Sequence, residues 1–215
     1  MAQRKHRDYP DNGFPSVTEV LGVLRKIGLE MWYKFNTIEF INRESSKGKI
    51  SGTDTHTAIE TYINAGELKV ETQFPEEVTN ALHSFVLFRK EHPEIILKGT
   101  ERAMTSEIYQ FNGTMDIDAT INNVPVIGDW KTSTAKSKDK PEIYPEYITQ
   151  VSAYRHLYSE TCGIWVNFAF IVALAKDKVA YNLRYIDKEE LEDNFTEVFL
   201  PALKIFQFQH RKKEN

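Results

Sequence analysis

The sequence predicts an α/β protein, and two observations support this prediction. Apolar residues recur at helical spacing through the first third of the chain, to about residue 92, whereas residues 95–130 are rich in the β-branched and aromatic residues typical of strands. A further helical segment, two more strand-like segments and a last helix follow. No internal repeat, low-complexity tract or linker divides the 215 residues, so we expect one domain. A hydrophobic fraction of 41 % is enough for a sizeable core.

Four helices are expected in the first third. The first is capped by Ser16 or Thr18 and ends at Gly28. The second spans about 29–44 and stops before the polar turn Ser45-Ser46-Lys47-Gly48. The third begins near residue 53 or 54 and ends at Gly66. The fourth opens at Pro75, with acidic residues in its first turn, and continues to His92-Pro93.

Short strands are expected next. Residues 95–103, 107–121 and 124–130 form a three-stranded meander, with turns or bends at Asn112-Gly113 and Asn122-Asn123. A lysine-containing loop then leads to a helix over about 141–159. Strands over 164–175 and 178–185 precede a last helix from Lys188 to about Gln209.

Several classes of protein are excluded by composition. The single cysteine, Cys162, leaves no intramolecular disulfide, zinc ribbon or cysteine-ligated cluster, so any metal is bound by oxygen and histidine. Neither GxxxxGK[ST] nor GxGxxG occurs. The net charge of −4 does not decide the partner, because screening leaves that to local patches. The N-terminus does not look like a secretory signal, and the longest apolar run, 164–175, is too short to span a bilayer, so we expect a cytoplasmic protein.

Two aspartates and a lysine form the most informative pattern. Asp116 follows Gly113, and Asp129 precedes Lys131 by two residues on the next expected strand. Side chains alternate along a strand, so Asp129 and Lys131 share one face, and Asp116 can lie beside Asp129. The alternative is a solvated strand end with Asp116 as a turn residue. If the pattern is functional, its oxygen ligands suit Mg²⁺ or Mn²⁺ and phosphate chemistry.

Four short motifs together resemble the PD-(D/E)XK nuclease superfamily in its RecB-like branch. In the chain order of that branch they are His56 in Gly52-Thr53-Asp54-Thr55-His56, Asp116 in Gly113-Thr114-Met115-Asp116, Asp129-Trp130-Lys131, and Gln150 with Tyr154 in a QxxxY segment. The resemblance covers roughly residues 15–185. Two further segments, Pro15-Ser16-Val17-Thr18 and Gly28-Leu29-Glu30-Met31-Trp32, are similar to small stand-alone and phage-type members of this branch. The mitochondrial genome maintenance exonuclease resembles these members too. Each motif alone is weak, but the ordered set is specific.

The resemblance implies a fold and a set of roles. The fold is a restriction-endonuclease-like core, a central mixed sheet flanked by helices, with a helical N-terminal extension. Asp116 and Asp129 match metal ligands, the main-chain carbonyl of Trp130 is another, and His56 joins the metal site. Lys131 matches the catalytic lysine. Since an ammonium group is a poor base near neutrality, we expect Lys131 to orient water and stabilise charge. A lone histidine on a helix is otherwise more often packed or on the surface.

The remaining candidates support the site. Gln150 and Tyr154 lie four residues apart on one helical face, and by resemblance they hold Lys131 and the substrate backbone. A core tyrosine beside an amide is the alternative. Glu101 matches an acid often found one strand before Asp116 in this branch and is a further candidate. Glu107 and Asp118 compete with it for that role.

These observations lead to a functional hypothesis. Residues 1–215 form one nuclease-like domain, with a helical part over about 15–92, the catalytic sheet and helix over about 94–186, and a last helix over about 187–210. We expect an Mg²⁺- or Mn²⁺-dependent deoxyribonuclease, with an exonuclease favoured, that acts on single-stranded or end-containing DNA in replication, recombination or repair. Lys136, Lys138 and Lys140 are the candidate DNA contacts. The alternative is a catalytically silent nucleic-acid-binding protein with a nuclease fold.

Overall fold

The computed structural model describes residues 12–66, 74–136 and 138–211. A five-stranded sheet occupies its centre, in the spatial order β1 (Ile95–Gly99), β4 (Ile117–Ile121), β5 (Val124–Ser133), β6 (Phe168–Ala175) and β7 (Tyr181–Asp187). Strands β5 and β6 are parallel, whereas the other neighbouring pairs are antiparallel. A separate hairpin consists of β2 (Arg102–Ser106) and β3 (Phe111–Met115). The predicted α/β class with a central mixed sheet is confirmed.

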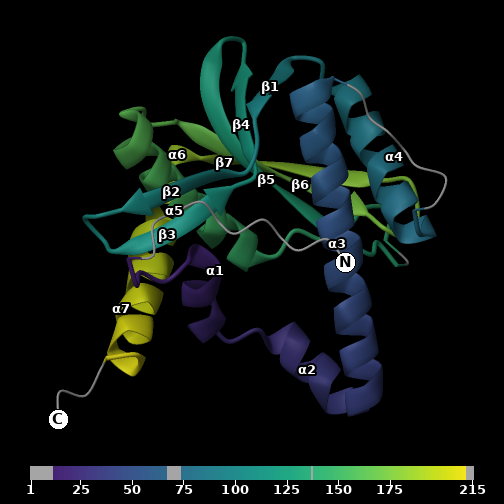
Figure 1. The fold of residues 1–215 in the computed structure, drawn as a ribbon, viewed down its shortest axis with the longest axis horizontal. Helices are drawn as coiled ribbons and strands as arrows, with labels where there is room; N and C mark the ends of the chain where they lie inside the picture. Colours follow the sequence, from purple (N-terminus) through teal and green to yellow (C-terminus); the bar gives the residue numbers. More distant parts are fainter. Residues whose placement is uncertain (1–11, 67–73, 137, 212–215) are drawn as a thin grey trace.

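Helices cover both faces of this sheet (Figure 1). On one face, α3 (Ile38–Ala65) and α4 (Glu76–Glu91) enclose a core that includes Trp130 and Phe170. On the other face, α5 (Pro145–Cys162), α1 (Val17–Val20) and the C-terminal helices enclose a second core around Ile127 and Ile171. The two cores alternate along β5 and β6 because successive strand side chains point to opposite faces. A parallel β5–β6 pair buried on both faces explains the nearly continuous apolar sequence of β6.

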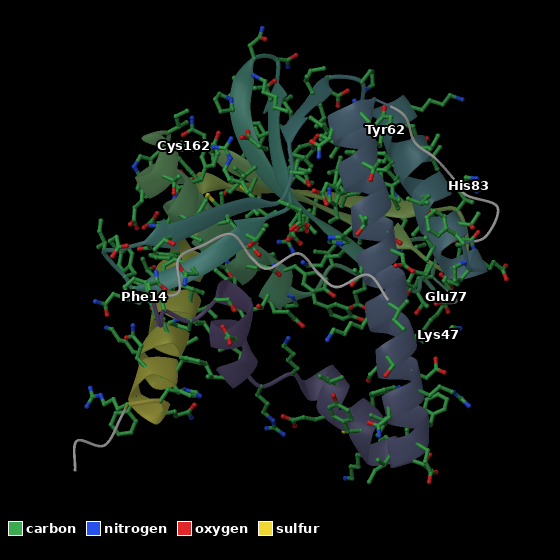
Figure 2. All side chains as sticks on the ribbon, in the orientation of Figure 1. Phe14, Lys47, Tyr62, Glu77, His83 and Cys162 are labelled. Carbon is green, nitrogen blue, oxygen red and sulfur yellow. The ribbon has the colours of Figure 1, made fainter. Side chains whose placement is uncertain are left out.

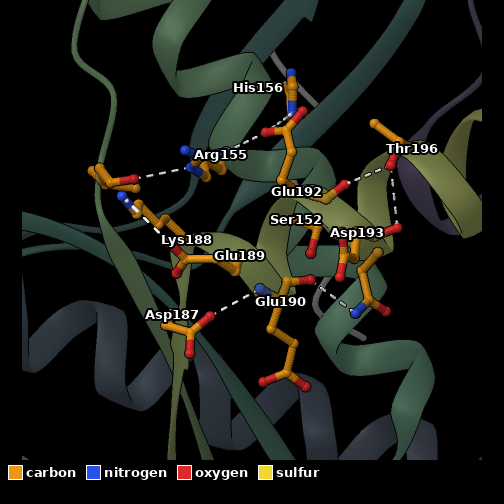
Figure 3. A network of polar contacts seen from close by, with 12 residues as sticks. Ser152, Arg155, His156, Asp187, Lys188, Glu189, Glu190, Glu192, Asp193 and Thr196 are labelled. Atoms are coloured by element: carbon orange, nitrogen blue, oxygen red, sulfur yellow. Dashed lines mark hydrogen bonds and ion pairs between the residues drawn. The ribbon is translucent and has the colours of Figure 1, made fainter.

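The C-terminal segment is a helix with a π-helical interruption. It runs through α6 (Lys188–Asp193), a π-helical segment (Asn194–Phe199) and α7 (Leu200–Gln209). A polar network ties its start to the outer side of α5 (Figure 3). Arg155 donates to the carbonyl of Val166 at 2.9 Å and to Glu192 at 2.8 Å. His156 stacks on Phe195 with 3.4 Å between ring centroids, and burial lowers the pKa of His156 to about 4. This network joins α5 to α6, to the π-helical segment and to the loop before β6.

The N-terminal helices differ from the prediction at two points. The first helix is only α1 and a 3-10 turn, Leu21–Val23, and Gly28 lies inside the next helix, α2 (Ile27–Phe35), instead of ending one. The predicted turn at residues 45–48 is helical and belongs to α3, which is capped by the Thr37 side chain. The helix predicted over about 29–44 is therefore divided between α2 and α3, and its second part is continuous with the helix predicted from residue 53 or 54. Helix α4 agrees with the predicted fourth helix. Helix α3 ends at Gly66, as predicted, and this glycine has a left-handed φ of 74°.

Close packing explains why α3 tolerates serine and glycine in its interior. The residues of α3 that are buried are Ser51, Thr55 and Ile59. A Cβ atom on Gly52 would lie 3.4 Å from Thr132 Oγ1 of β5, so α3 packs directly against the sheet at this point. The glycine lowers helix propensity by about 1 kcal/mol, and tertiary contact overrides this cost. Lys47 of α3 also pairs with Glu77 of α4 at 2.8 Å (Figure 2).

The predicted three-stranded meander is wrong. Residues 95–103 divide between β1 and β2, and the chain turns at Glu101, whose φ is 51°. Asn112-Gly113 lies inside β3 and is not a turn, because the hairpin turn falls at residues 107–110. The predicted strand over 107–121 is likewise interrupted, at Asp116, and only β1, β4 and β5 share a sheet. The expected turn at Asn122-Asn123 is present, with both φ angles positive.

No helix within the described ranges is long and apolar enough to span a membrane.

Candidate active site

Strand β5 presents Asp129 and Lys131 on one face of the sheet. Between them, Trp130 points to the other face and packs edge-on against Phe85 and Phe88 of α4, at centroid distances of 5.3 and 5.7 Å. This anchor fixes the rotation of the strand. Asp129 is fully buried, and its Oδ2 atom is ion-paired with Lys131 Nζ, whose side chain is 18 % exposed. The two residues therefore share one small, largely dry space, as the alternation of side chains requires.

Asp116 reaches this space from the break between β3 and β4 and not from within a strand. Because Ile117 pairs with Gly128 in the β4–β5 register, the preceding residue lies beside Asp129. The main-chain N–H of Trp130 donates to Asp116 Oδ2 at 3.3 Å. The Asp116 side chain is 13 % exposed, so it forms the boundary between the buried Asp129 and the solvent.

His56 and Glu101 join Asp116 in a cluster of one imidazole and two carboxylates. His56 Nδ1 of α3 lies 3.5 Å from Asp116 Oδ2, within reach because of the close packing of α3 at Gly52, one turn earlier. Glu101 is exposed and lies in the link between β1 and β2. One ligand atom from each of His56, Glu101 and Asp116 lies within 4.8 Å of the others. The structure thus brings together residues that are 60 positions apart in sequence.

The two acids that competed with Glu101 lie elsewhere. Glu107 is exposed in the β2–β3 turn. Asp118 is buried, pairs with Arg102 at 2.8 Å and accepts a hydrogen bond from the Tyr158 hydroxyl at 3.3 Å. Neither acid belongs to the cluster with His56 and Asp116, so Glu101 is the additional acid that the geometry favours.

Helix α5 places an amide and a phenol behind Asp129. Gln150 Nε2 donates to Asp129 Oδ1 at 3.4 Å and to the Tyr154 hydroxyl oxygen at 2.7 Å. All three side chains are buried. Burial and the nearby Asp129 and Asp116 charges raise the pKa of Tyr154 well above 10.0, so its hydroxyl stays protonated near neutrality. Gln150 therefore connects Asp129 to the helix and orients its carboxylate.

Gly113 has a role that the motif pattern alone did not indicate. A Cβ atom there would lie 2.6 Å from Leu157 Cδ1 and 3.0 Å from Tyr154 Cε1. Glycine at this position of β3 therefore lets the Tyr154 and Leu157 side chains of α5 pack directly against the strand. A glycine inside a strand is a sign of such close approach and is the signal that could have revealed this role.

The three candidate DNA-contacting lysines lie in the loop after β5, outside the cluster. The side chain of Lys136 is exposed, and its main-chain N–H donates to Asp177 at 2.8 Å. Lys138 pairs with Glu142 at 2.8 Å, whereas Lys140 is exposed. Together with Arg184, Lys138 and Lys140 line a surface hollow of about 430 Å³.

The two aspartates carry strongly perturbed carboxyl groups. Burial is the main cause that raises the pKa of Asp116 to about 6 and that of Asp129 to about 7. The Lys131 ammonium opposes both shifts, while Glu101 adds to the shift of Asp116, and Asp116 adds to that of Asp129. Such crowding of buried acids favours the binding of either a proton or a cation.

We therefore expect Asp116→Asn to stabilise the metal-free protein near pH 8. The ordinary pKa of Asp116 is 3.8, and the folded state raises it to about 6, so protonation stabilises the fold at low pH. That contribution is lost as the pH rises through 6, and the buried charge then costs on the order of 3 kcal/mol. Denaturant unfolding in EDTA should show Asp116→Asn gaining roughly 1–3 kcal/mol at pH 8 and less at pH 5. An equal gain at both pH values would contradict this cause.

The donor set fits a divalent cation. His56, Glu101 and Asp116 offer one nitrogen and carboxylate oxygens around one point, and hard oxygen donors suit Mg²⁺ and Mn²⁺. Asp129 contacts the same region from the buried side. The fit of the Trp130 main-chain carbonyl as a further donor stays a prediction.

Comparison with solved structures places this fold among known ones. A protein from Eubacterium rectale, provisionally named an exonuclease, matches with a TM-score of 0.59 at 14 % identity, covering 99 % of this chain and 89 % of that one. An alkaline exonuclease from Laribacter hongkongensis matches with a TM-score of 0.40 at 14 % identity, covering 92 % and 91 % of the two chains. A phage-related exonuclease from Haemophilus somnus has a TM-score of 0.38 at 14 % identity, covering 73 % and 80 %.

The first of these similarities establishes a shared fold. No family model matches the sequence, and no curated protein matches it either.

Proposed function

We propose that this protein is a divalent-metal-dependent deoxyribonuclease of the PD-(D/E)XK type, in its RecB-like branch, with an exonuclease favoured. The observation that carries the proposal is the convergence of His56, Glu101 and Asp116 beside the Asp129–Lys131 pair. Clusters of acidic residues alone are common in proteins. Here a lysine, Lys131, also lies beside the cluster and pairs with the buried Asp129, and a lysine in that position can stabilise charge on a phosphate. The ordered motifs and the fold shared with the Eubacterium rectale protein add to this support.

Each side chain has a role in phosphodiester hydrolysis. His56, Glu101, Asp116 and Asp129 would hold the cation, which when bound neutralises phosphate charge and lowers the pKa of a water molecule. Lys131 stabilises the charge that develops on the phosphate and orients the attacking water. Gln150 fixes the Asp129 carboxylate, and the protonated Tyr154 supports Gln150.

DNA is the proposed substrate, entering as a single strand or at an end. Lys136, Lys138 and Lys140 follow the catalytic strand directly, and two of them line a surface hollow together with Arg184 and Glu142. Lysine contacts to phosphates do not depend on sequence and weaken with salt. A role in replication, recombination or repair, and a relation to phage-type and mitochondrial genome maintenance exonucleases, are parts of the same proposal.

The second candidate is a nucleic-acid-binding protein that has kept the nuclease fold without turnover. The intact acids and Lys131 argue against it. A sequence-specific endonuclease is disfavoured because the His56 and Gln150–Tyr154 motifs are typical of the RecB-like branch. An assay of the purified protein distinguishes these candidates. End-labelled linear, circular and single-stranded DNA are incubated with Mg²⁺ or Mn²⁺, and product lengths are followed over time.

An exonuclease shortens the linear and single-stranded substrates and spares the circle. Cleavage of the circle would indicate an endonuclease, and binding without products would favour the silent protein. Asp129→Asn purified in the same way controls for a contaminating nuclease, because only the authentic activity should disappear with this single substitution.

Mn²⁺ or Mg²⁺ is expected to raise the Tm of the wild type more than that of Asp116→Asn. A cation that binds only the folded state stabilises it by mass action, and Asp116→Asn removes a charged ligand. Thermal unfolding with increasing metal concentration measures the effect. Glu107→Gln is the matched control, since it removes an exposed acid outside the cluster and should keep the wild-type response. Identical metal responses of wild type and Asp116→Asn would rule out Asp116 as a ligand.

A further inference from the structure

Lys131 has a second partner besides Asp129. Its Nζ atom lies over the ring of Tyr147 of α5, at 5.2 Å from the centroid. Tyr147 is half-buried and packs against the core on the α5 face of the sheet. Its main-chain N–H donates to the Tyr144 carbonyl at 3.0 Å, and the Tyr144 ring meets it edge-on at 5.5 Å. Tyr147 is therefore held in place by contacts of both its main chain and its ring.

Tyr147 precedes Gln150 by three residues and lies on the same face of α5. One helical face thus supplies contacts to both members of the Asp129–Lys131 pair: Gln150 to the carboxylate and Tyr147 to the ammonium. The position of Tyr147 lies outside the QxxxY segment, and the sequence pattern assigned it no role.

The ring suits a lysine that must act on a phosphate. An aromatic face attracts an ammonium ion through its quadrupole and carries no formal negative charge. The Tyr147 ring takes up none of the Lys131 N–H donors in a conventional hydrogen bond, whereas the Asp129 carboxylate engages the ammonium in an ion pair. Burial also raises the pKa of the Tyr147 hydroxyl, so the ring stays neutral beside the lysine.

We propose that Tyr147 is a positioning residue that holds the Lys131 ammonium over its ring at the candidate active site. The inference rests on the proposed nuclease function for its kinetic consequence, but the contact itself can be tested without it. The aromatic face and not the hydroxyl carries the effect, so phenylalanine should substitute and an aliphatic residue should not.

The kinetic test uses single-turnover cleavage at saturating DNA and fixed salt. We expect Tyr147→Leu to lower the rate about tenfold with little change in DNA affinity or Tm, and Tyr147→Phe to stay within about twofold of wild type. In a Lys131→Ala background, Tyr147→Leu should have no further effect, because the two residues act as a unit. Tyr185→Leu, on the opposite face of the sheet beside Phe170, is the control and should cut at the wild-type rate.

Three kinetic results would overturn the inference: a wild-type rate for Tyr147→Leu, an equal loss for Tyr147→Phe, or an undiminished loss in the Lys131→Ala background. Tyr147→Met, whose long unbranched side chain adapts to the space without a ring, replaces Tyr147→Leu if that variant misfolds.

A second readout needs no nuclease activity. Labelling by an amine-directed reagent, followed by mass spectrometry, reports how well Lys131 is protected in the free protein. Tyr147→Leu should raise the labelling rate of Lys131 several-fold, while the rate of Lys140 stays unchanged. If the wild type proves unable to cut DNA, the proposed function fails, and this labelling result still decides whether Tyr147 holds Lys131. Unaltered Lys131 labelling would refute the contact.

Discussion

Asp129→Asn is expected to slow DNA cleavage by at least about a thousandfold while the chain stays folded. The substitution keeps the shape of the side chain and its contact with Gln150, but removes the charge that pairs with Lys131 and contributes to cation binding. Charge stabilisation of this kind contributes several kcal/mol in metal-assisted phosphate chemistry, which corresponds to this loss in rate. Single-turnover cleavage of end-labelled single-stranded DNA in Mn²⁺ and in Mg²⁺ measures it.

Asp129→Ala should give the same loss of rate. Asp129 is fully buried, so alanine leaves a small cavity, and circular dichroism and a Tm measurement establish that the fold persists. Asp118→Asn is the matched control, because it alters a buried aspartate that contacts Arg102 and Tyr158 and lies outside the cluster. Cleavage by folded Asp129→Asn at the wild-type rate would be decisive against the nuclease proposal.

Lys131→Ala is expected to lose turnover by roughly two to three orders of magnitude and to keep metal and DNA binding. Removing one group that stabilises developing charge costs about this much in enzymes. His56, Glu101 and Asp116 remain in place, as does the lysine loop after β5, so binding of the metal and of DNA should persist. The rate under single-turnover conditions and the DNA affinity at the same salt are measured side by side.

Lys131→Arg should restore little of the rate. The planar guanidinium is larger than an ammonium and cannot take its position between Asp129 and the Tyr147 ring, since the site is largely enclosed. Lys140→Ala serves as the control for general loss of positive charge, and it should weaken DNA binding at most modestly and in a salt-dependent way. A Lys131→Ala variant that cuts DNA as fast as wild type would show that Lys131 takes no part in cleavage and that the proposed mechanism is wrong.

Local periodicity determined a large part of what the sequence could predict. The two-residue repeat of a strand places Asp129 and Lys131 on one face, and the helical repeat places Gln150 and Tyr154 on one side of α5. Both relations involve residues within four positions of each other, so they do not depend on the rest of the fold. The α/β class and the helices α4 and α5 follow from the same kind of local pattern.

Only the tertiary structure decided how the separate motifs meet. The sequence predicted a meander, but the chain divides it into a hairpin and part of a larger sheet, with Asp116 at the break and Glu101 at a turn of positive φ. No local preference favours a glutamate in that conformation, so packing of the surrounding strands must hold it there. The sequence likewise predicted a turn at Asn112-Gly113, yet Gly113 lies inside β3, where α5 packs closely against the strand. The sequence by itself determined which residues share a strand or helix face, because that depends on backbone geometry. Only the tertiary structure decided that His56, Glu101 and Asp116 lie close together, because this depends on contacts between distant segments of the chain.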